Sequence, residues 1–224
     1  MPDAPWHNAV LQDEAEAEAA REQVRSLGLG PHKDLPKNWD ALGALDAVLR
    51  ATRPSDRVLD AGGTRYSTIA PWLWRYGYRK LLVVDLTFKR PSSLGSIRYL
   101  PGDLTQTGLA TGSLGAMTCM SVIEHGVDLH AYFAEAARLL RPGGVLATST
   151  DFHPDPPDTG GKQAYGGPIR IFDTPAVESA LATAREYGLE PTASLVVGSP
   201  KRPVRWERYG LSYTFALFTL RRTA

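Results

Sequence analysis

The sequence predicts an α/β fold: a doubly wound, mostly parallel seven-stranded sheet with an antiparallel last strand, preceded by a helical N-terminal extension. First, short apolar runs alternate with amphipathic stretches from residue 56 onward, a pattern typical of a parallel sheet covered by helices on both faces. Second, two of these runs end in an acid, Asp60 and Asp85, and two glycines follow the first. Third, apolar runs at 193–197 and 212–220 indicate a closing hairpin whose last strand is antiparallel.

The segment before the sheet, residues 1–52, is predicted to be a helical extension or lid. Residues 13–25 are rich in Ala and Glu and poor in large apolar side chains, so they predict a surface helix that the glycines and proline of 28–31 end. A second helix is expected from Asn38 or Asp40, because the apolar residues that follow recur at helical spacing.

The second part, residues 53–224, is predicted to be one Rossmann-like domain that binds a nucleotide-type cofactor. Apolar runs of strand length predict strands over 57–61, 80–85, 97–100, 116–121 and 145–150. Amphipathic spacing predicts helices over 67–76, 129–140 and 174–187. Arg-Pro-Gly-Gly at 141–144 predicts the end of the helix before it and leads into the fifth strand, because proline cannot continue that helix.

Composition limits the classes of function. With 224 residues, 43% hydrophobic and 22% charged, the chain can bury one full core. The net charge of +1 gives no overall field toward nucleic acid or an anionic membrane. The sequence lacks a basic, apolar leader and any apolar run of the ~18 residues that a membrane span requires, so we expect a cytoplasmic protein. The lone Cys119 is expected to be a small buried side chain.

The turn Asp-Ala-Gly-Gly at 60–63 predicts the entrance of the cofactor site. Glycines let the backbone turn sharply and let a ligand approach without a Cβ in the way. Asp85 ends the next strand, where an acid can hold the hydroxyls of a ribose. Open α/β sheets bind ligands at the carboxyl ends of their strands, so these acids are expected to lie at one edge.

Several segments together resemble the class I S-adenosylmethionine-dependent methyltransferases, in particular the small bacterial enzymes that modify metabolites. They are Val-Leu-Asp-Ala-Gly-Gly at 58–63, Val-Val-Asp at 83–85, Pro-Gly-Asp-Leu at 101–104, Ser-Val-Ile-Glu-His at 121–125 and Leu-Leu-Arg-Pro-Gly-Gly-Val-Leu at 139–146. The resemblance implies the cofactor S-adenosylmethionine. It places the first acid and the glycines under the methionine part, the second acid at the ribose, and the Asp-Leu pair at the adenine.

The residues that the resemblance assigns to the cofactor are Asp60, Gly62, Gly63, Thr64, Ser67, Asp85, Leu86, Asp103, Leu104, Ser121 and Val122. One departure from the family pattern matters, because Thr64 and Tyr66 stand where the family has glycines. The loop must therefore differ locally, and the hydroxyl of Ser67 is expected to cap the next helix.

Acceptor contacts are expected from three loops beyond the carboxyl ends of the strands, 121–128, 150–173 and 197–210. The middle loop places three carboxylates and an imidazole in a proline-stiffened segment, which favours a fixed site. The basic residues of the last loop suit a phosphate or carboxylate on the acceptor, or pair with the acids. The candidate bases are His125, His153 and Asp151. The candidate acceptor contacts are Trp39, Glu124, Asp155, Asp158, Tyr165 and Arg170.

The sequence thus predicts methyl transfer to nitrogen or oxygen of a small polar metabolite, with a sugar or a sugar-containing natural product favoured. We expect no nucleic-acid or membrane partner, and a homodimer is an open possibility. Two alternatives stay open: a non-catalytic cofactor-binding partner or regulatory protein, and an NAD-dependent oxidoreductase. No metal is assigned, although Glu124 and His125 with Asp151 and His153 would be the candidate ligands of a divalent ion.

Overall fold

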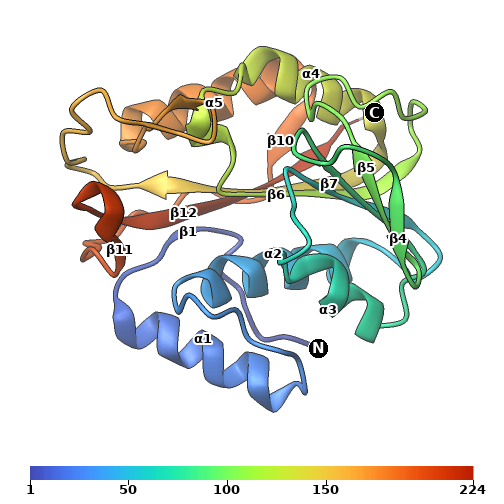
Figure 1. Ribbon diagram of the computed structural model, residues 1–224, viewed down its shortest axis with the longest axis horizontal. Coiled ribbons are helices and arrows are strands. Elements are labelled where there is room, and N and C mark those ends of the chain that lie inside the picture. Colours follow the sequence, from blue (N-terminus) through green and yellow to red (C-terminus); the bar gives the residue numbers. More distant parts are fainter. Residues whose placement is uncertain (224) are drawn as a thin grey trace.

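The computed structural model describes residues 1–223 and consists of one twisted sheet between two layers of helices (Figure 1). The strand order is β1-β12-β7-β6-β2-β3-β5-β4, and β10 and β11 also pair with β12. The strands of this sheet are β1 (Asn8–Val10), β2 (Arg57–Ala61), β3 (Lys80–Asp85), β4 (Ser92–Leu94), β5 (Ile97–Pro101), β6 (Leu114–Met120), β7 (Leu140–Phe152), β10 (Leu189–Pro191), β11 (Val204–Trp206) and β12 (Leu211–Arg222). A separate hairpin consists of β8 (Gln163–Ala164) and β9 (Gly167–Pro168).

The centre of the sheet confirms the predicted fold class. Strands β5, β3, β2, β6 and β7 are parallel, and β12 runs antiparallel to β7, with Thr214 opposite Phe152. The short strands β1, β4, β10 and β11 at its margins extend the sheet to ten strands. These four strands are not predicted from the sequence, because each has only three residues, too few to show a periodic pattern.

The strand predicted over 193–197 is wrong. The edge beside β12 is shared by β10 and by β1, which comes from the N-terminal segment. Residues 193–197 pass alongside β1 and are joined to it through Val196, whose amide donates to the carbonyl of Asn8 at 3.0 Å. The bridge does not bury the run, because Val196 remains 65% exposed.

The helices cover both faces of the sheet, with α1, α2 and α3 on one side and α4 and α5 on the other (Figure 1). Their bounds are α1 (Glu14–Ser26), α2 (Lys37–Ala51), α3 (Ile69–Arg75), α4 (Leu129–Leu139) and α5 (Thr174–Glu186), with short 3-10 turns η1 (Ile123–His125) and η2 (Glu207–Tyr209). Aspartates cap three of them, because the carboxylates of Asp13, Asp128 and Asp173 accept from amides of the first turn.

The N-terminal helices pack onto the sheet through an aromatic pair. The ring of Trp39 in α2 stacks on Trp6 at 5.9 Å, and its indole N–H donates to Glu16 of α1 at 2.9 Å. Trp39 is completely buried, so its side chain cannot stack on a ligand, which corrects the expectation that it contacts the acceptor. Its role is to lock α1 against α2.

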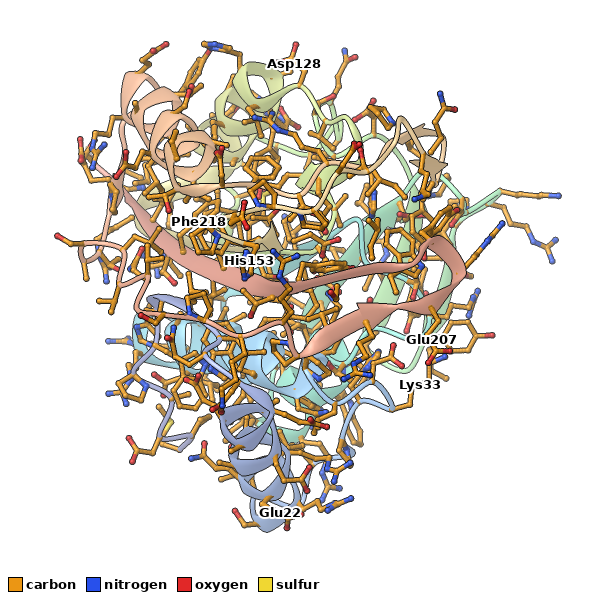
Figure 2. The ribbon with its side chains drawn as sticks, turned by 90° about the vertical axis from the view of Figure 1, so that its left-hand side faces the viewer. Glu22, Lys33, Asp128, His153, Glu207 and Phe218 are labelled. Atoms are coloured by element: carbon orange, nitrogen blue, oxygen red, sulfur yellow. The ribbon has the colours of Figure 1, made fainter. Side chains whose placement is uncertain are left out.

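The carboxyl ends of the parallel strands all meet at one edge, which faces the viewer in Figure 2, and His153 lies near the middle of that view. In Figure 1 the chain that follows β7 passes over this edge at the left. In the described part of the chain, residues 1–223, no helix has the length and apolarity to cross a membrane.

Candidate functional site

The turn after β2 is built so that a carboxylate lies under two glycines. Asp60 is buried, its Oδ1 accepts from Thr118 at 2.8 Å, and its Oδ2 has no hydrogen-bond partner among residues 1–223. A Cβ on Gly63 would lie 2.2 Å from that Oδ2. Gly62 has φ +73°, and a Cβ there would lie 2.6 Å from the side chain of Val122. Both glycines are therefore required by space, and burial raises the pKa of Asp60 to about 7.

The next two strand ends present acids held by threonines two residues later. The Oδ1 of Asp85 accepts from the amide and the hydroxyl of Thr87. The Oδ1 of Asp103 accepts from the amide and the hydroxyl of Thr105, at 2.8 and 2.7 Å. One oxygen of each acid is thus used locally, and the other is left for a ligand. Leu86 is 74% exposed beside Asp85, an unusual exposure for a large apolar side chain, whereas Leu104 is buried.

The glycine loop departs from the family pattern in the way that the sequence indicates, but Ser67 does not cap a helix. Its hydroxyl accepts from the amide of Thr64 at 2.8 Å, and α3 begins two residues later with Thr68 at its N-cap position. The loop is therefore closed on itself by Ser67. Tyr66, in a position where the family has glycine, is 87% exposed.

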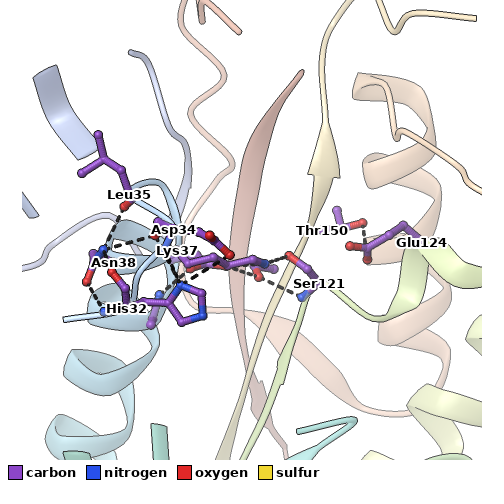
Figure 3. A network of polar contacts seen from close by, with 11 residues as sticks. His32, Asp34, Leu35, Lys37, Asn38, Ser121, Glu124 and Thr150 are labelled. Atoms are coloured by element: carbon purple, nitrogen blue, oxygen red, sulfur yellow. Dashed lines mark hydrogen bonds and ion pairs between the residues drawn. The ribbon is translucent and has the colours of Figure 1, made fainter. Parts of the chain in front are cut away.

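The end of β6 lies against the start of α2. Ser121 has a positive φ of 52°, and its amide donates to the carbonyl and to the hydroxyl of Ser149 on β7, at 3.0 and 3.1 Å. Its own hydroxyl accepts from the ammonium of Lys37, which reaches across from α2 (Figure 3). Lys37 also lies 3.5 Å from a carboxylate oxygen of Asp40 and 4.2 Å from the centre of the Phe215 ring.

Lys37 is placed by the loop that precedes α2. Buried Asn38 accepts from the amide of His32 at 2.8 Å, and its amide group donates to carbonyls of His32, Asp34 and Leu35 (Figure 3). These bonds fix the first turn of α2. The backbone that carries Lys37 is therefore held in place.

Two buried acids, Glu124 and Asp151, lie side by side behind Lys37. Glu124 accepts from the hydroxyl of Thr150 at 3.2 Å, and its Oε1 has no partner among residues 1–223. Burial raises the pKa of Asp151 to about 6, and burial and the neighbouring Asp151 raise the pKa of Glu124 well above its usual range. The Lys37 ammonium acts in the opposite direction on both. Such a pair readily holds one proton between its members.

His125 lies next to this pair and faces an aromatic group. Its ring is 4.8 Å from that of Tyr165 on the β8–β9 turn and 6.2 Å from that of Trp206 on β11. Its Nδ1 is buried without a partner among residues 1–223. Burial and the Lys37 ammonium lower the pKa of His125 to about 4, so the imidazole is neutral at pH 7.

Four of the residues expected at the acceptor have side chains that make contacts outside the acid pair. His153 is used in a local turn, since its Nδ1 bonds to the backbone of Asp155. Asp155 is exposed and lies 3.6 Å from Arg202, and Asp158 accepts from the amide of Gly160. The guanidinium of Arg170 lies over the Phe172 ring, 4.4 Å from its centre. The carboxylates that the structure gathers are those of Asp40, Glu124 and Asp151 instead.

Several residues of this cluster are not predicted from the sequence: Lys37, Asp40, Ser149, Trp206 and Tyr213. Tyr213 neighbours Asp151, and Ser149 donates to Asp40 at 2.7 Å. A lysine and an aspartate one turn apart at a helix start are common on protein surfaces, so their burial could not be read from spacing. Within residues 1–223, no three His, Cys, Asp or Glu side chains are arranged to hold a metal ion.

Comparisons with known proteins agree with this geometry. Residues 59–148 match the family described as "Methyltransferase domain". The matched segment is less than half of the chain. It includes the strand ends with Asp60, Asp85 and Asp103 and the segment 121–125, whereas Lys37 and Asp151 lie outside the matched residues.

The relatives are similar over part of their length. Malonyl-(acyl-carrier protein) O-methyltransferase of Serratia marcescens is 32% identical over 108 residues, which are 45% of this chain and 40% of that protein. A ubiquinone biosynthesis O-methyltransferase of Xanthomonas oryzae pv. oryzae is 52% identical over 40 residues, 18% of this chain and 17% of that protein. The match thus spans less than half of the length of these curated relatives.

A solved structure extends the likeness to the whole fold. The Burkholderia thailandensis 1,6-didemethyltoxoflavin-N1-methyltransferase, with 1,6-didemethyltoxoflavin and S-adenosylhomocysteine bound, has a TM-score of 0.60 and 18% identity, covering 94% of this chain and 87% of that one. At this identity the likeness concerns the fold alone: this chain has the same fold as that methyltransferase structure, which agrees with the fold that the sequence resemblance implies.

Proposed function

We propose that this protein transfers a methyl group from S-adenosylmethionine to oxygen or nitrogen of a small polar metabolite, with a sugar or a sugar-containing natural product as the favoured class. The observation that carries the proposal is the arrangement of side chains at the carboxyl ends of the parallel strands, where the sheet edge has two halves of different chemistry. One half offers a glycine turn over a buried acid and two further strand-end acids, and the other offers a buried acid pair beside a lysine.

The residues of the first half fit S-adenosylmethionine. A Cβ on Gly63 would fill the space beside Asp60, whose Oδ2 lacks a partner within residues 1–223, and a Cβ on Gly62 would meet Val122. Asp60 with these glycines would hold the methionine part, and Asp85 the ribose hydroxyls. Asp103 and Leu104 would border the adenine. S-adenosylmethionine supplies an electrophilic methyl group on a sulfonium.

Asp151 is the residue that we propose as the base. A general base works best when its pKa lies near the working pH, because it is then ionised and still takes up a proton. The pKa of Asp151, about 6, meets this condition better than that of His125, about 4. Asp151 would accept the proton that the acceptor oxygen or nitrogen loses, and Glu124 would share it.

Lys37 would keep this base ionised. Without a cation, two adjacent buried carboxyl groups would hold protons to higher pH, since desolvation and mutual repulsion both favour the neutral form. The ammonium of Lys37 acts against both effects. Its contact with Ser121 joins the base to the loop that would border the cofactor.

The test is turnover with a panel of small hydroxyl- and amine-bearing metabolites, followed by the appearance of S-adenosylhomocysteine. Calorimetry on the same preparation measures binding of S-adenosylhomocysteine and of NADH. Product formation with an acceptor supports the proposal. Binding of S-adenosylhomocysteine without turnover across the panel would favour a non-catalytic partner or regulatory protein. Tight NADH binding without S-adenosylhomocysteine binding would instead indicate an oxidoreductase.

A further inference from the structure

The turn between β8 and β9 holds a tyrosine in a backbone conformation that tyrosine rarely adopts. Ala164 pairs with Gly167, so Tyr165 and Gly166 form a two-residue turn, and both have positive φ, 53° and 88°. Such turns favour Asn-Gly or Gly-Gly, because a bulky side chain is disfavoured at positive φ. Tyr165 is also 83% exposed, so core packing does not compensate for the strain. A strained, exposed aromatic residue beside a candidate site suggests a role in binding.

The structure holds this tyrosine in a fixed place. A Cβ on Gly167 would lie 2.1 Å from the carbonyl oxygen of His125, so the hairpin packs with its bare backbone on the loop after β6. On its other side, the Tyr209 hydroxyl donates to the carbonyl of Gln163 at 3.0 Å. The hairpin is therefore tied to both segments that border it.

Tyr165 is one wall of an aromatic surface. Its ring and that of Trp206 are nearly parallel, with 22° between their planes and 6.2 Å between their centres. Trp206 meets Tyr209 edge-on at 4.5 Å. A pocket of about 290 Å³ lies among these residues and is lined by Gln163, Ala164, Tyr165, Gly166, Trp206, Arg208 and Tyr209.

Arg208 gives this pocket a positive charge. Its guanidinium lies 5.3 Å from the centre of the Tyr209 ring. Among residues 1–223, no carboxylate lies within ion-pair distance of Arg208. An arginine that stacks on an aromatic ring and has no acidic partner is well suited to bind a phosphate or carboxylate group.

We propose that Tyr165, Trp206 and Arg208 form the acceptor-binding site, and that it takes a ring with a flat face and an anionic substituent. The inference rests on the proposed function and defines the acceptor class. The flat face would stack on the aromatic wall, and the phosphate or carboxylate would pair with Arg208. An aromatic carboxylate and a sugar phosphate share this chemistry.

The experiment uses Tyr165→Asn, because asparagine tolerates positive φ and keeps the turn. The matched control is Leu94→Asn, which replaces another exposed apolar side chain at the opposite edge of the sheet. Calorimetry measures the binding of 4-hydroxybenzoate, glucose 6-phosphate and their uncharged counterparts phenol and glucose, in the presence of S-adenosylhomocysteine. Thermal unfolding is followed for each variant.

We expect at least one anionic probe to bind the wild-type protein. Tyr165→Asn should weaken that binding at least tenfold while leaving the unfolding temperature unchanged or higher, and Leu94→Asn should leave it unchanged. Arg208→Gln should weaken the anionic probes more than the uncharged ones. Which anionic probe binds decides between an aromatic and a sugar ring.

Three results would overturn the inference: no binding of either anionic probe at millimolar concentration, equal binding by wild type and Tyr165→Asn, or a marked loss of thermal stability in Tyr165→Asn. The last result would mean that the tyrosine is structural. Failure of the proposed function is distinguishable, because it would appear as absent S-adenosylhomocysteine binding in the wild-type protein itself.

Discussion

The two halves of the edge are built in different ways. At the ends of β3 and β5 each acid is held by a threonine two residues away, and the glycine turn after β2 is closed by a serine three residues from its partner. At the ends of β6 and β7 the partners are distant, with 84 positions between Lys37 and Ser121 and 109 between Asp40 and Ser149. Apart from the bond from Thr118 to Asp60, the hydrogen bonds of the first half are thus local, whereas those of the second half form only after the chain has folded.

The largest effect is expected from Gly63→Ala in the local half. Because the added Cβ would lie 2.2 Å from the Asp60 carboxylate, either the turn or the acid must move. We expect the affinity for S-adenosylhomocysteine, measured by calorimetry, to fall at least ~1000-fold, about 4 kcal/mol. Gly30→Ala is the control, because a Cβ there meets nothing within 4 Å. Equal affinity in the two variants would remove the glycine turn from the cofactor site.

This contrast explains how much could be predicted from the sequence. A local signature in the sequence marks each of the five parallel strands, the acids that follow three of them and the glycine turn. The structure places these acids, Asp60, Asp85 and Asp103, at successive strand ends. Trp39 shows the limit, because a tryptophan at a helix start looks the same whether it faces a ligand or a second helix. The acids of 151–158 show it too: Asp151 is the last residue but one of β7 and is buried, whereas Asp155 is 95% exposed.

The next effect concerns the buried acid of the local half. A carboxyl group whose pKa is raised to about 7 in the folded state keeps its proton there, while the unfolded chain loses it near the ordinary value of 3.8. The folded form therefore binds more protons between these values, and stability falls as the pH rises through this window. His125, with its pKa lowered to about 4, acts in the opposite direction, so the informative quantity is a difference between two variants.

Asp60→Asn isolates that contribution, since asparagine can still accept from Thr118. We expect the variant to gain stability over the wild type as the pH rises from 4 to 8, by up to about 4 kcal/mol at 1.36 kcal/mol per pKa unit. Urea unfolding of the ligand-free protein across this range measures it. A difference that does not change with pH would show that the pKa of Asp60 is the same in the folded and the unfolded chain, as that of an exposed acid would be.

The third effect tests the tertiary half. Asp151→Asn removes the proposed base and should lower kcat by about 100-fold with an acceptor from the panel, within the range that a positioned base contributes. In the wild type, kcat/KM should rise with pH through about 6, because the base must lose its proton, and the variant should lack this rise. Asp155→Asn tests the exposed acid that the sequence analysis places at the acceptor. A larger loss of kcat in that variant than in Asp151→Asn would contradict the buried acid pair as the base.

The smallest effect is expected from Lys37→Gln, and it shows whether the ammonium controls the base. Lys37 lowers the pKa of Asp151, so its removal should raise that pKa and move the rising limb of the kcat/KM profile to higher pH. The rate on the alkaline plateau should change little, because the base is ionised there in both proteins. Lys33→Gln, an exposed lysine four residues earlier, should leave the limb in place. A limb that stays at the same pH in Lys37→Gln would mean that the ammonium does not control the base, and that its contact with Ser121 only anchors α2 to the edge.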